Sequence, residues 1–388
     1  MVSILISVIY LAFISLGLPD SLLGSAWPVM QLDLAVHLSY AGVISMIIAG
    51  GTIVSSLLSD RLTCRLGTGL VTAVSVALTA VALLGFSLSS AFWMLCLWAV
   101  PYGLGAGAVD AALNNYVALY YSSRHMSWLH CMWGVGASVG PYIMGACLAG
   151  SAGWRGGYRA ISVIQVVLTA VLFFSLPLWQ KRRGGGQSDE SASKPLGLKK
   201  ALQIPGVPYV LLAFFGYCGM ETTAGLWASS YMVHHLHVDV ETAARFASLF
   251  YLGITLGRFL NGFVADRLGD KRLIRIGVIV VLAGIVMLAL PLGSLFLALA
   301  GLVVIGIGCA PIYPCIIHAT PANFGRENSQ AIVGIQMASA YVGSTFMPPF
   351  FGLLAGWTSL AIYPFYLALF ALLMLAMTER LNRLKRSR

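Results

Sequence analysis

The sequence GFVADRLGDKR occupies residues 262–272, and a looser copy, SLLSDRLTCRLG, occupies residues 56–67. Each copy places an Asp-Arg pair in a short charged stretch that follows a long apolar stretch. The second copy fits the pattern G-x-x-x-D-R-x-G-x-[KR]-[KR]; the first has Ser56 in the glycine place and four extra residues before Gly67. Charged loops at equivalent places in the two halves indicate an internal repeat.

The composition is that of a membrane protein. The chain has 388 residues, of which 59% are hydrophobic and only 9% are charged, whereas a soluble domain carries about 25% charged residues. Most of the surface must therefore face lipid. No cleavable signal peptide is expected, because Met1–Tyr10 lacks a basic start. The seven cysteines show no metal-binding spacing and are interpreted as buried apolar residues without disulfides.

Twelve apolar segments are long enough to cross a bilayer, which takes about 20 residues in a helix. All twelve are predicted to be helices, because lipid offers no partner to unpaired backbone groups. The expected spans are 4–30, 38–58, 69–88, 92–121, 127–149, 156–178, 207–233, 242–263, 273–291, 295–318, 327–354 and 359–379.

Lysines and arginines predict the orientation. Most of them fall in the loops and termini that share one side of the membrane, so the positive-inside rule places both termini in the cytoplasm of a plasma (inner) membrane. The net charge of +10 follows from this bias and favours contact with anionic lipid over nucleic acid. Residues 180–206, rich in Gly, Ser and charge, are predicted to be a cytoplasmic linker between the domains 1–179 and 207–388.

On the paired charged loops, the chain resembles the major facilitator superfamily over essentially its whole length. The resemblance implies an all-α membrane protein with twelve transmembrane helices in two pseudo-symmetric six-helix bundles, working as a monomer by alternating access. The loop aspartates could cap a helix and pair with an arginine of a neighbouring helix, forming a cytoplasmic latch, or form a plain solvated ion pair. The latch candidates are Asp60, Arg61, Asp266, Arg267, Lys271 and Arg272.

Three carboxylates lie away from the ends of predicted spans, namely Asp20, Asp110 and Glu221. A charged residue at mid-membrane costs about 2.5–3.5 kcal/mol on insertion scales, so these acids are interpreted as cation-coupling residues. Asp20 follows Pro19, which kinks a helix and frees a backbone carbonyl. The alternative is that each acid makes a structural hydrogen bond or ion pair and has no role in coupling.

Amides, indoles and one histidine in the spans are the candidate substrate ligands. Asp110 and Asn114 share a helix face, and such groups suit a sugar, which offers hydroxyls at its rim and C–H groups on its faces. Contacts between helices are the alternative role. Arg258 is placed close to the cytoplasmic end of its span, so a strong anion is not expected. The candidates are Trp27, Asn114, Asn115, His130, Trp133, Gln165, Trp227 and Gln336.

Within the superfamily, Pro19-Asp20 and the run Gly107-x-x-Asp110-x-x-x-Asn114 resemble the fucose permease group. The resemblance implies uptake of a small neutral hydroxylated solute coupled to H⁺ or Na⁺, with Asp20 as proton carrier and Asp110 as the acid that binds sugar. This chain departs from that group, which has Glu at Asp110 and Asn at Trp133. Proton-coupled efflux of lipophilic or cationic compounds is the alternative. No catalytic Ser or Cys arrangement and no phosphate-binding loop occurs, so neither an enzyme nor a cofactor is expected.

Overall fold

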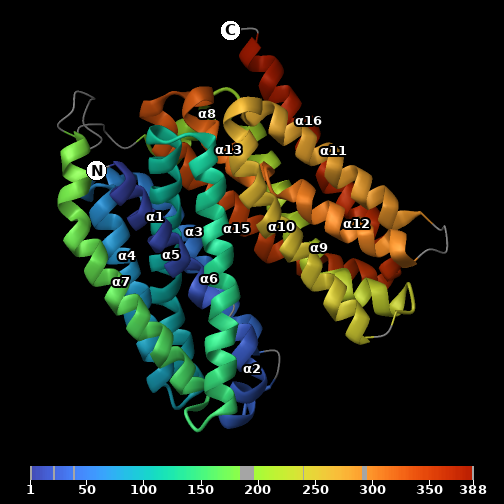
Figure 1. The fold of residues 1–388 in the computed structure, drawn as a ribbon, viewed down its shortest axis with the longest axis horizontal. Helices are drawn as coiled ribbons and strands as arrows, with labels where there is room; N and C mark the ends of the chain where they lie inside the picture. Colours follow the sequence, from blue (N-terminus) through green and yellow to red (C-terminus); the bar gives the residue numbers. More distant parts are fainter. Residues whose placement is uncertain are drawn as a thin grey trace. The chain divides into compact units, whose positions relative to one another are not determined.

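The computed structural model describes residues 2–20, 22–37, 40–183, 196–238, 240–290 and 295–386, and every regular element in these ranges is a helix (Figure 1). The first seven are α1 (Val2–Asp20), α2 (Leu22–Asp33), α3 (Tyr40–Leu66), α4 (Thr68–Leu88), α5 (Phe92–Tyr120), α6 (Ser123–Ala149) and α7 (Gly153–Arg183). They are followed by α8 (Leu198–Gln203), α9 (Val207–His234), α10 (Val240–Leu268), α11 (Asp270–Ala289), α12 (Leu295–Cys309), α13 (Ile312–His318), α14 (Thr320–Phe324), α15 (Arg326–Trp357), the short 3₁₀ turn η1 (Leu360–Ile362) and α16 (Tyr363–Arg386).

The chain forms two compact units. The first contains residues 1–116 and 129–198, and the second contains residues 117–128 and 199–388. Residues 117–128 are the last turn of α5, the connection, and the first turns of α6. The second unit therefore includes a helical tip whose two arms belong to the first unit, a feature that a division at the predicted linker does not contain. Residues 184–195 of that linker lie outside the described residues.

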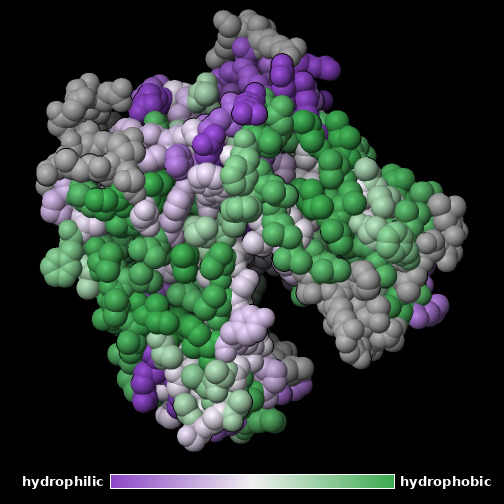
Figure 2. All heavy atoms as spheres, viewed as in Figure 1, coloured by the Kyte–Doolittle hydropathy of each residue, from purple (hydrophilic) through white to green (hydrophobic). Residues whose placement is uncertain are grey.

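Within the described residues, every predicted span consists mainly of helix. Among the described residues, nine segments are long and apolar enough to cross a membrane. The remaining predicted spans lie in α9, α10 and α15, which have 28, 29 and 32 residues. These three helices are less apolar because they carry residues such as Glu221, Arg258 and Gln336. Figure 2 shows apolar side chains over the outer faces of both units, while hydrophilic side chains gather around the end of α16.

Glycines set the closest helix contacts in the first unit. A Cβ on Gly103 or Gly107 of α5 would run into the backbone carbonyls of Ile48 or Thr52 of α3. Small residues in this span therefore let the two helices approach closely. Gly136 and Gly140 of α6 lie in the same way against the backbone of α1.

The second unit repeats the same pairings. Gly343 of α15 lies against the carbonyl of Phe215 in α9, and Gly306 of α12 lies against the carbonyl of Phe250 in α10. In each unit, therefore, the first long helix packs closely on the fifth and the second packs closely on the fourth. The repeat seen in the charged loops extends to the way the helices pack.

Candidate functional site

Asp20 lies at the end of α1, directly after Pro19. Tyr102 donates its hydroxyl to Asp20 Oδ1 at 3.1 Å, and Trp133 donates its indole N–H to Oδ2 at 2.8 Å. Tyr102 on α5 is buried, whereas the Asp20 side chain is exposed. Both partners are neutral hydrogen-bond donors, so Asp20 can bind or lose a proton without leaving an opposite charge unpaired.

The backbone beside Pro19 is hydrogen-bonded to another helix. Proline has no N–H, so the carbonyl four residues earlier, that of Ser15, loses its helical partner. Gln165 of α7 fills the vacancy, because its amide N–H donates to the Ser15 carbonyl while its Oε1 accepts from the Ser15 hydroxyl at 2.9 Å. Gln165 is fully buried. The structure therefore places this substrate-binding candidate at a contact between α1 and α7.

A second polar network surrounds Asp110. The Asn114 amide donates to Asp110 Oδ1 at 2.7 Å, and its oxygen lies 3.0 Å from His130 Nε2. Because the Asn114 amide nitrogen donates to the carboxylate, the Asn114 oxygen is the atom that faces His130. An amide oxygen can only accept, so His130 Nε2 carries a hydrogen. All three side chains are buried, as is the neighbouring Asn115. The edge of the His130 ring meets Phe13 of α1, with ring centroids 5.4 Å apart.

Both networks end on one helix. His130 and Trp133 are three residues apart on α6 and so share a face. The structure thus brings together two groups of candidates, Asp20 with Trp133, and Asp110 with Asn114 and His130. Tyr102 completes the first group and was not identified from the sequence, since 82 positions separate it from Asp20.

The third membrane acid has a cation as its partner. Arg258 of α10 donates to Glu221 of α9 at 3.3 Å, and its guanidinium lies 6.0 Å from the ring centroid of Tyr313. The Arg258 side chain is only 6% exposed and that of Glu221 is 19% exposed. Arg258 is therefore a buried, paired cation, while its depth in the membrane stays a prediction. Span limits alone could not show that a carboxylate on another helix compensates an interior arginine.

The other candidates make separate contacts. Trp27 is buried in the apolar core of the first unit with Leu22 and Met30. Trp227 donates its indole N–H to the carbonyl of Pro348 at 2.9 Å. Gln336 accepts from the hydroxyl of Thr320 at 3.0 Å, and its buried amide nitrogen has no hydrogen-bond partner within the described part of the chain. A role of Trp27, Trp227 or Gln336 in binding stays a prediction.

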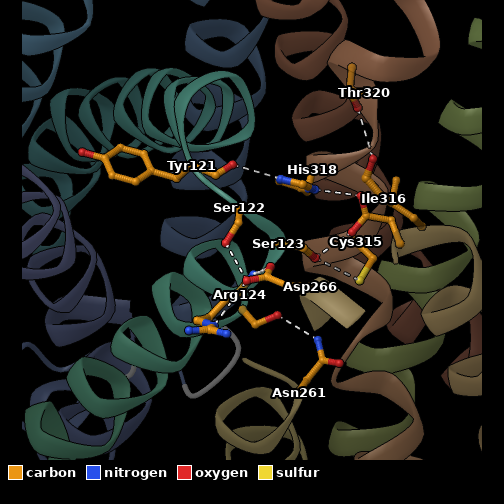
Figure 3. A network of polar contacts seen from close by, with 12 residues as sticks. Tyr121, Ser122, Ser123, Arg124, Asn261, Asp266, Cys315, Ile316, His318 and Thr320 are labelled. Carbon is orange, nitrogen blue, oxygen red and sulfur yellow. Dashed lines mark hydrogen bonds and ion pairs between the residues drawn. The ribbon is translucent and has the colours of Figure 1, made fainter. Parts of the chain in front are cut away.

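The aspartates of the two repeated loops differ. Asp266 accepts the backbone N–H of Arg124 at 3.1 Å and pairs with the Arg124 guanidinium at 3.3 Å, as Figure 3 shows. It thereby caps the start of α6 and forms the expected type of ion pair. Asp60 accepts from the N–H of Leu196 at 3.0 Å and from Cys64, and ion-pairs with no arginine among the described residues. The other latch candidates have exposed side chains, namely Arg61, Arg267, Lys271 and Arg272.

These features describe a multi-pass membrane transport protein. The family model of the Major Facilitator Superfamily matches residues 9–220 and again residues 209–387. The chain belongs to the Major Facilitator Superfamily. Its function is transport, not enzymatic catalysis.

Solved structures of transporters share the fold. A crystal structure of FucP in the outward conformation, a protein described elsewhere as the fucose:proton symporter of E. coli, is similar with a TM-score of 0.80 and 15% identity, over 97% of this chain and 98% of FucP. The human organic anion transporter MFSD10 is similar with a TM-score of 0.76 and 13% identity, over 96% of this chain and 98% of MFSD10.

One curated relative carries a different solute in its name. The chain is 26% identical over 237 residues to the probable nitrate/nitrite antiporter NarK1 of Thermus thermophilus. The match covers 55% of this chain and 51% of that relative, so it spans about half the length of each.

Proposed function

We propose that the chain is a secondary transporter that couples entry of H⁺ or Na⁺ to uptake of a small neutral sugar or polyol. The observation that carries the proposal is Asp20, a carboxylate in a membrane span that is bound by two neutral donors. The likeness in fold to the fucose:proton symporter supports it. Alternating access between domains 1–179 and 207–388, in a plasma membrane with both termini in the cytoplasm, completes the proposal.

Protonation of Asp20 changes its contacts in a defined way. The indole of Trp133 can only donate, so a proton on Asp20 Oδ2 would face the indole hydrogen and break that bond. The hydroxyl of Tyr102 can reverse its role and accept from a proton on Oδ1. In either case the indole of Trp133 loses a hydrogen bond to a charged acceptor, so the charge state of Asp20 acts on α6.

The Asp110 network supplies the solute side of the proposal. Asp110 and Asn114 offer a carboxylate and an amide that can bind hydroxyl groups, and the ring of Trp133 offers an apolar face for C–H groups. His130 lies one turn away on the same helix and holds the Asn114 amide in one orientation. A site of this kind rejects analogues without the matching hydroxyls, because its polar groups would be left unpaired.

The decisive variant is Asp20→Asn, tested in liposomes against a panel of hexoses and polyols. Uptake against a gradient should be abolished, because asparagine cannot exchange a proton, while counterflow of labelled solute should persist. Collapsing the proton gradient or removing Na⁺ identifies the coupled ion in the unaltered protein. Accumulation that survives in Asp20→Asn would show that Asp20 has a structural role only.

A second candidate function is the carriage of an anion, favoured by the buried Arg258. A buried guanidinium is the usual partner of a carboxylate or oxyanion ligand, and NarK1 and MFSD10 carry anions in their names. The Arg258 guanidinium is already paired with Glu221, so an anion would have to displace the Glu221 carboxylate. A thermal-shift screen separates the candidates, because a ligand that binds the folded protein raises its melting temperature. Stabilisation by nitrate or carboxylates supports transport of an anion. Stabilisation by sugars supports the sugar symporter, and stabilisation by cationic dyes alone supports an efflux role.

A further inference from the structure

Residues 117–128 form a tip that polar contacts hold within the second unit (Figure 3). Three of these contacts are made by backbone groups of the tip. The Leu119 carbonyl accepts from Arg326 at 3.0 Å, the Tyr121 carbonyl lies 3.1 Å from His318 Nε2, and the N–H of Arg124 donates to Asp266. Side chains of the tip add further contacts, among them Ser123, which donates to Asp270 at 2.7 Å, and Ser127, which accepts from Asn261 at 2.8 Å.

His318 differs from the other groups that hold the tip, because both of its ring nitrogens face acceptors. Nε2 faces the carbonyl of Tyr121, and Nδ1 lies 2.7 Å from the Asp270 carboxylate. A carbonyl can only accept, so Nε2 must carry a hydrogen, and an ionised carboxylate can only accept, so Nδ1 must carry one too. A neutral imidazole has a single N–H and can satisfy one of the two acceptors at most.

The extra proton belongs on the histidine. The ordinary pKa of an imidazole is about 6.5 and that of an aspartate about 3.9, so the ring is the stronger base. Asp270 begins α11, and its carboxylate also accepts a hydrogen bond from Ser123. The arrangement is therefore an imidazolium between a carboxylate and the backbone carbonyl of the tip.

We propose that His318 and Asp270 form a proton-binding site whose proton fastens the tip of the α5–α6 hairpin. Loss of the proton leaves the ring one N–H, so that either the contact with Asp270 or the contact with the Tyr121 carbonyl is broken. This site is separate from Asp20 and Asp110, and it does not depend on which solute is carried.

The charges around the site are balanced by named groups. Asp266 of α10 adds a second carboxylate near the ring and is itself paired with Arg124 of α6. Two further basic groups lie at the tip: His125 of α6 meets the ring of Tyr121, and Arg326 of α15 donates to the Leu119 carbonyl. Because Asp266 is already neutralised by Arg124, Asp270 is the acid that requires His318 to be charged.

The hairpin links this site to the rest of the molecule. Its arms carry Asp110 and Asn114 on α5, and His130 and Trp133 on α6. With a rise of about 1.5 Å per residue, His130 lies about 9 Å along α6 from Arg124. A change in how the tip is held therefore acts on the helix that contacts both acid networks.

The protonation state can be observed directly by NMR of protein labelled with nitrogen-15 in its seven histidines, with His318→Gln assigning the signals. At about pH 6, near the ordinary histidine range, both ring nitrogens of His318 should be protonated. A His318 ring with one unprotonated nitrogen at that pH would overturn the proposal.

The fastening is tested through Cys315, a native buried thiol whose sulfur lies 3.9 Å from the Ser123 hydroxyl of the tip. Its reaction with a maleimide, followed by peptide mass spectrometry, reports release of the tip. The reference at each pH is His318→Arg, a permanent cation, which removes the effect of pH on the thiol itself. Unaltered protein should match His318→Arg at about pH 6 and react about tenfold faster at about pH 8.5, on either side of histidine titration.

His318→Gln, which cannot become charged, should react about tenfold faster than His318→Arg at both pH values, and a tenfold ratio corresponds to about 1.4 kcal/mol. Size-exclusion chromatography and melting temperature establish that each variant is folded. If His318→Gln does not fold, Asp270→Asn replaces it, because this variant should react as His318→Gln would. The proposal would be overturned if the rate of Cys315 modification in the unaltered protein, divided by the rate in His318→Arg, stayed constant with pH. A His318→Arg protein that reacts as fast as His318→Gln would also overturn it.

Discussion

Asp20 in the first unit and Glu221 in the second are both membrane carboxylates, but their partners differ. Asp20 is exposed and bound by the neutral donors Tyr102 and Trp133, whereas Glu221 is half-buried and paired with Arg258. Protonating Asp20 removes a charge, but protonating Glu221 leaves an uncompensated guanidinium in an apolar interior. The comparison teaches that the sequence position of an acid does not define its role; the partner does. Asp20 is suited to exchange a proton, and Glu221 is suited to keep Arg258 neutralised.

The largest effect should come from breaking the pair in the second unit. Arg258→Leu should lower the free energy of unfolding by about 3–5 kcal/mol, because it strands a buried carboxylate. The double variant Arg258→Leu, Glu221→Leu should recover most of the loss, since an apolar pair of similar volume is often as stable as a buried ion pair. Denaturant unfolding of the purified protein measures both. Equal losses in the single and double variants would contradict the comparison.

Removing one neutral donor from Asp20 should have a smaller effect, seen in transport. Trp133→Phe deletes a hydrogen bond to a charged group, worth about 1.5–3 kcal/mol, so coupled uptake should fall about tenfold or more. Trp98→Phe is the matched control, because Trp98 packs against the apolar core of the first unit and is not a candidate ligand. It should alter stability without a comparable loss of uptake per folded protein. If both variants lose uptake equally, the indole of Trp133 has no special role at Asp20.

A third variant tests the hydrogen deduced on His130 Nε2. His130→Leu should lower the free energy of unfolding by about 1–3 kcal/mol, because the Asn114 oxygen loses its buried donor. His130→Gln, whose amide can donate to the same oxygen, should lose less. The melting temperatures of the two variants compare them directly. A glutamine variant as unstable as the leucine variant would indicate that His130 acts through its charge or its ring packing.

The smallest effect is expected at the end of α2, where Asp33 accepts from Arg155 at 2.6 Å and from the indole of Trp154 at 3.0 Å. The pair is partly exposed, so Asp33→Asn should cost no more than about 1 kcal/mol. Added salt should reduce even that difference, because exposed charges are screened. A loss as large as that of Arg258→Leu would remove the distinction between buried and exposed pairs on which the comparison rests.

The fold could be anticipated because its causes are local. Span length, loop charge and the repeated Asp-Arg loops depend on neighbouring residues and are visible in the sequence. The importance of Asp20 and Asp110 also follows from the cost of a charge in an apolar segment, although their coupling role stays a prediction. Arg258 shows the limit. Its compensation by Glu221 depends on two helices packing together, which spacing along the chain does not reveal.

The tip residues show the same limit at the latch. The sequence indicated that Asp266 could cap a helix and pair with an arginine, and both contacts are present. It did not indicate that the partner would be Arg124, 142 positions away. The spacing of the sequence likewise did not indicate the contacts of His318, because Asp270 and the Tyr121 carbonyl lie 48 and 197 positions away from it.

The bond between Gln165 and the Ser15 carbonyl has a consequence for relatives of this chain. Pro19 creates the vacancy that Gln165 fills, so neither residue can change alone without a loss. Restoring an N–H at position 19 would compete for the carbonyl and strand a buried amide, while losing Gln165 would leave the carbonyl bare in an apolar interior. We therefore expect the proline and the glutamine to be inherited and exchanged together, as a covarying pair 146 positions apart that records the contact between α1 and α7.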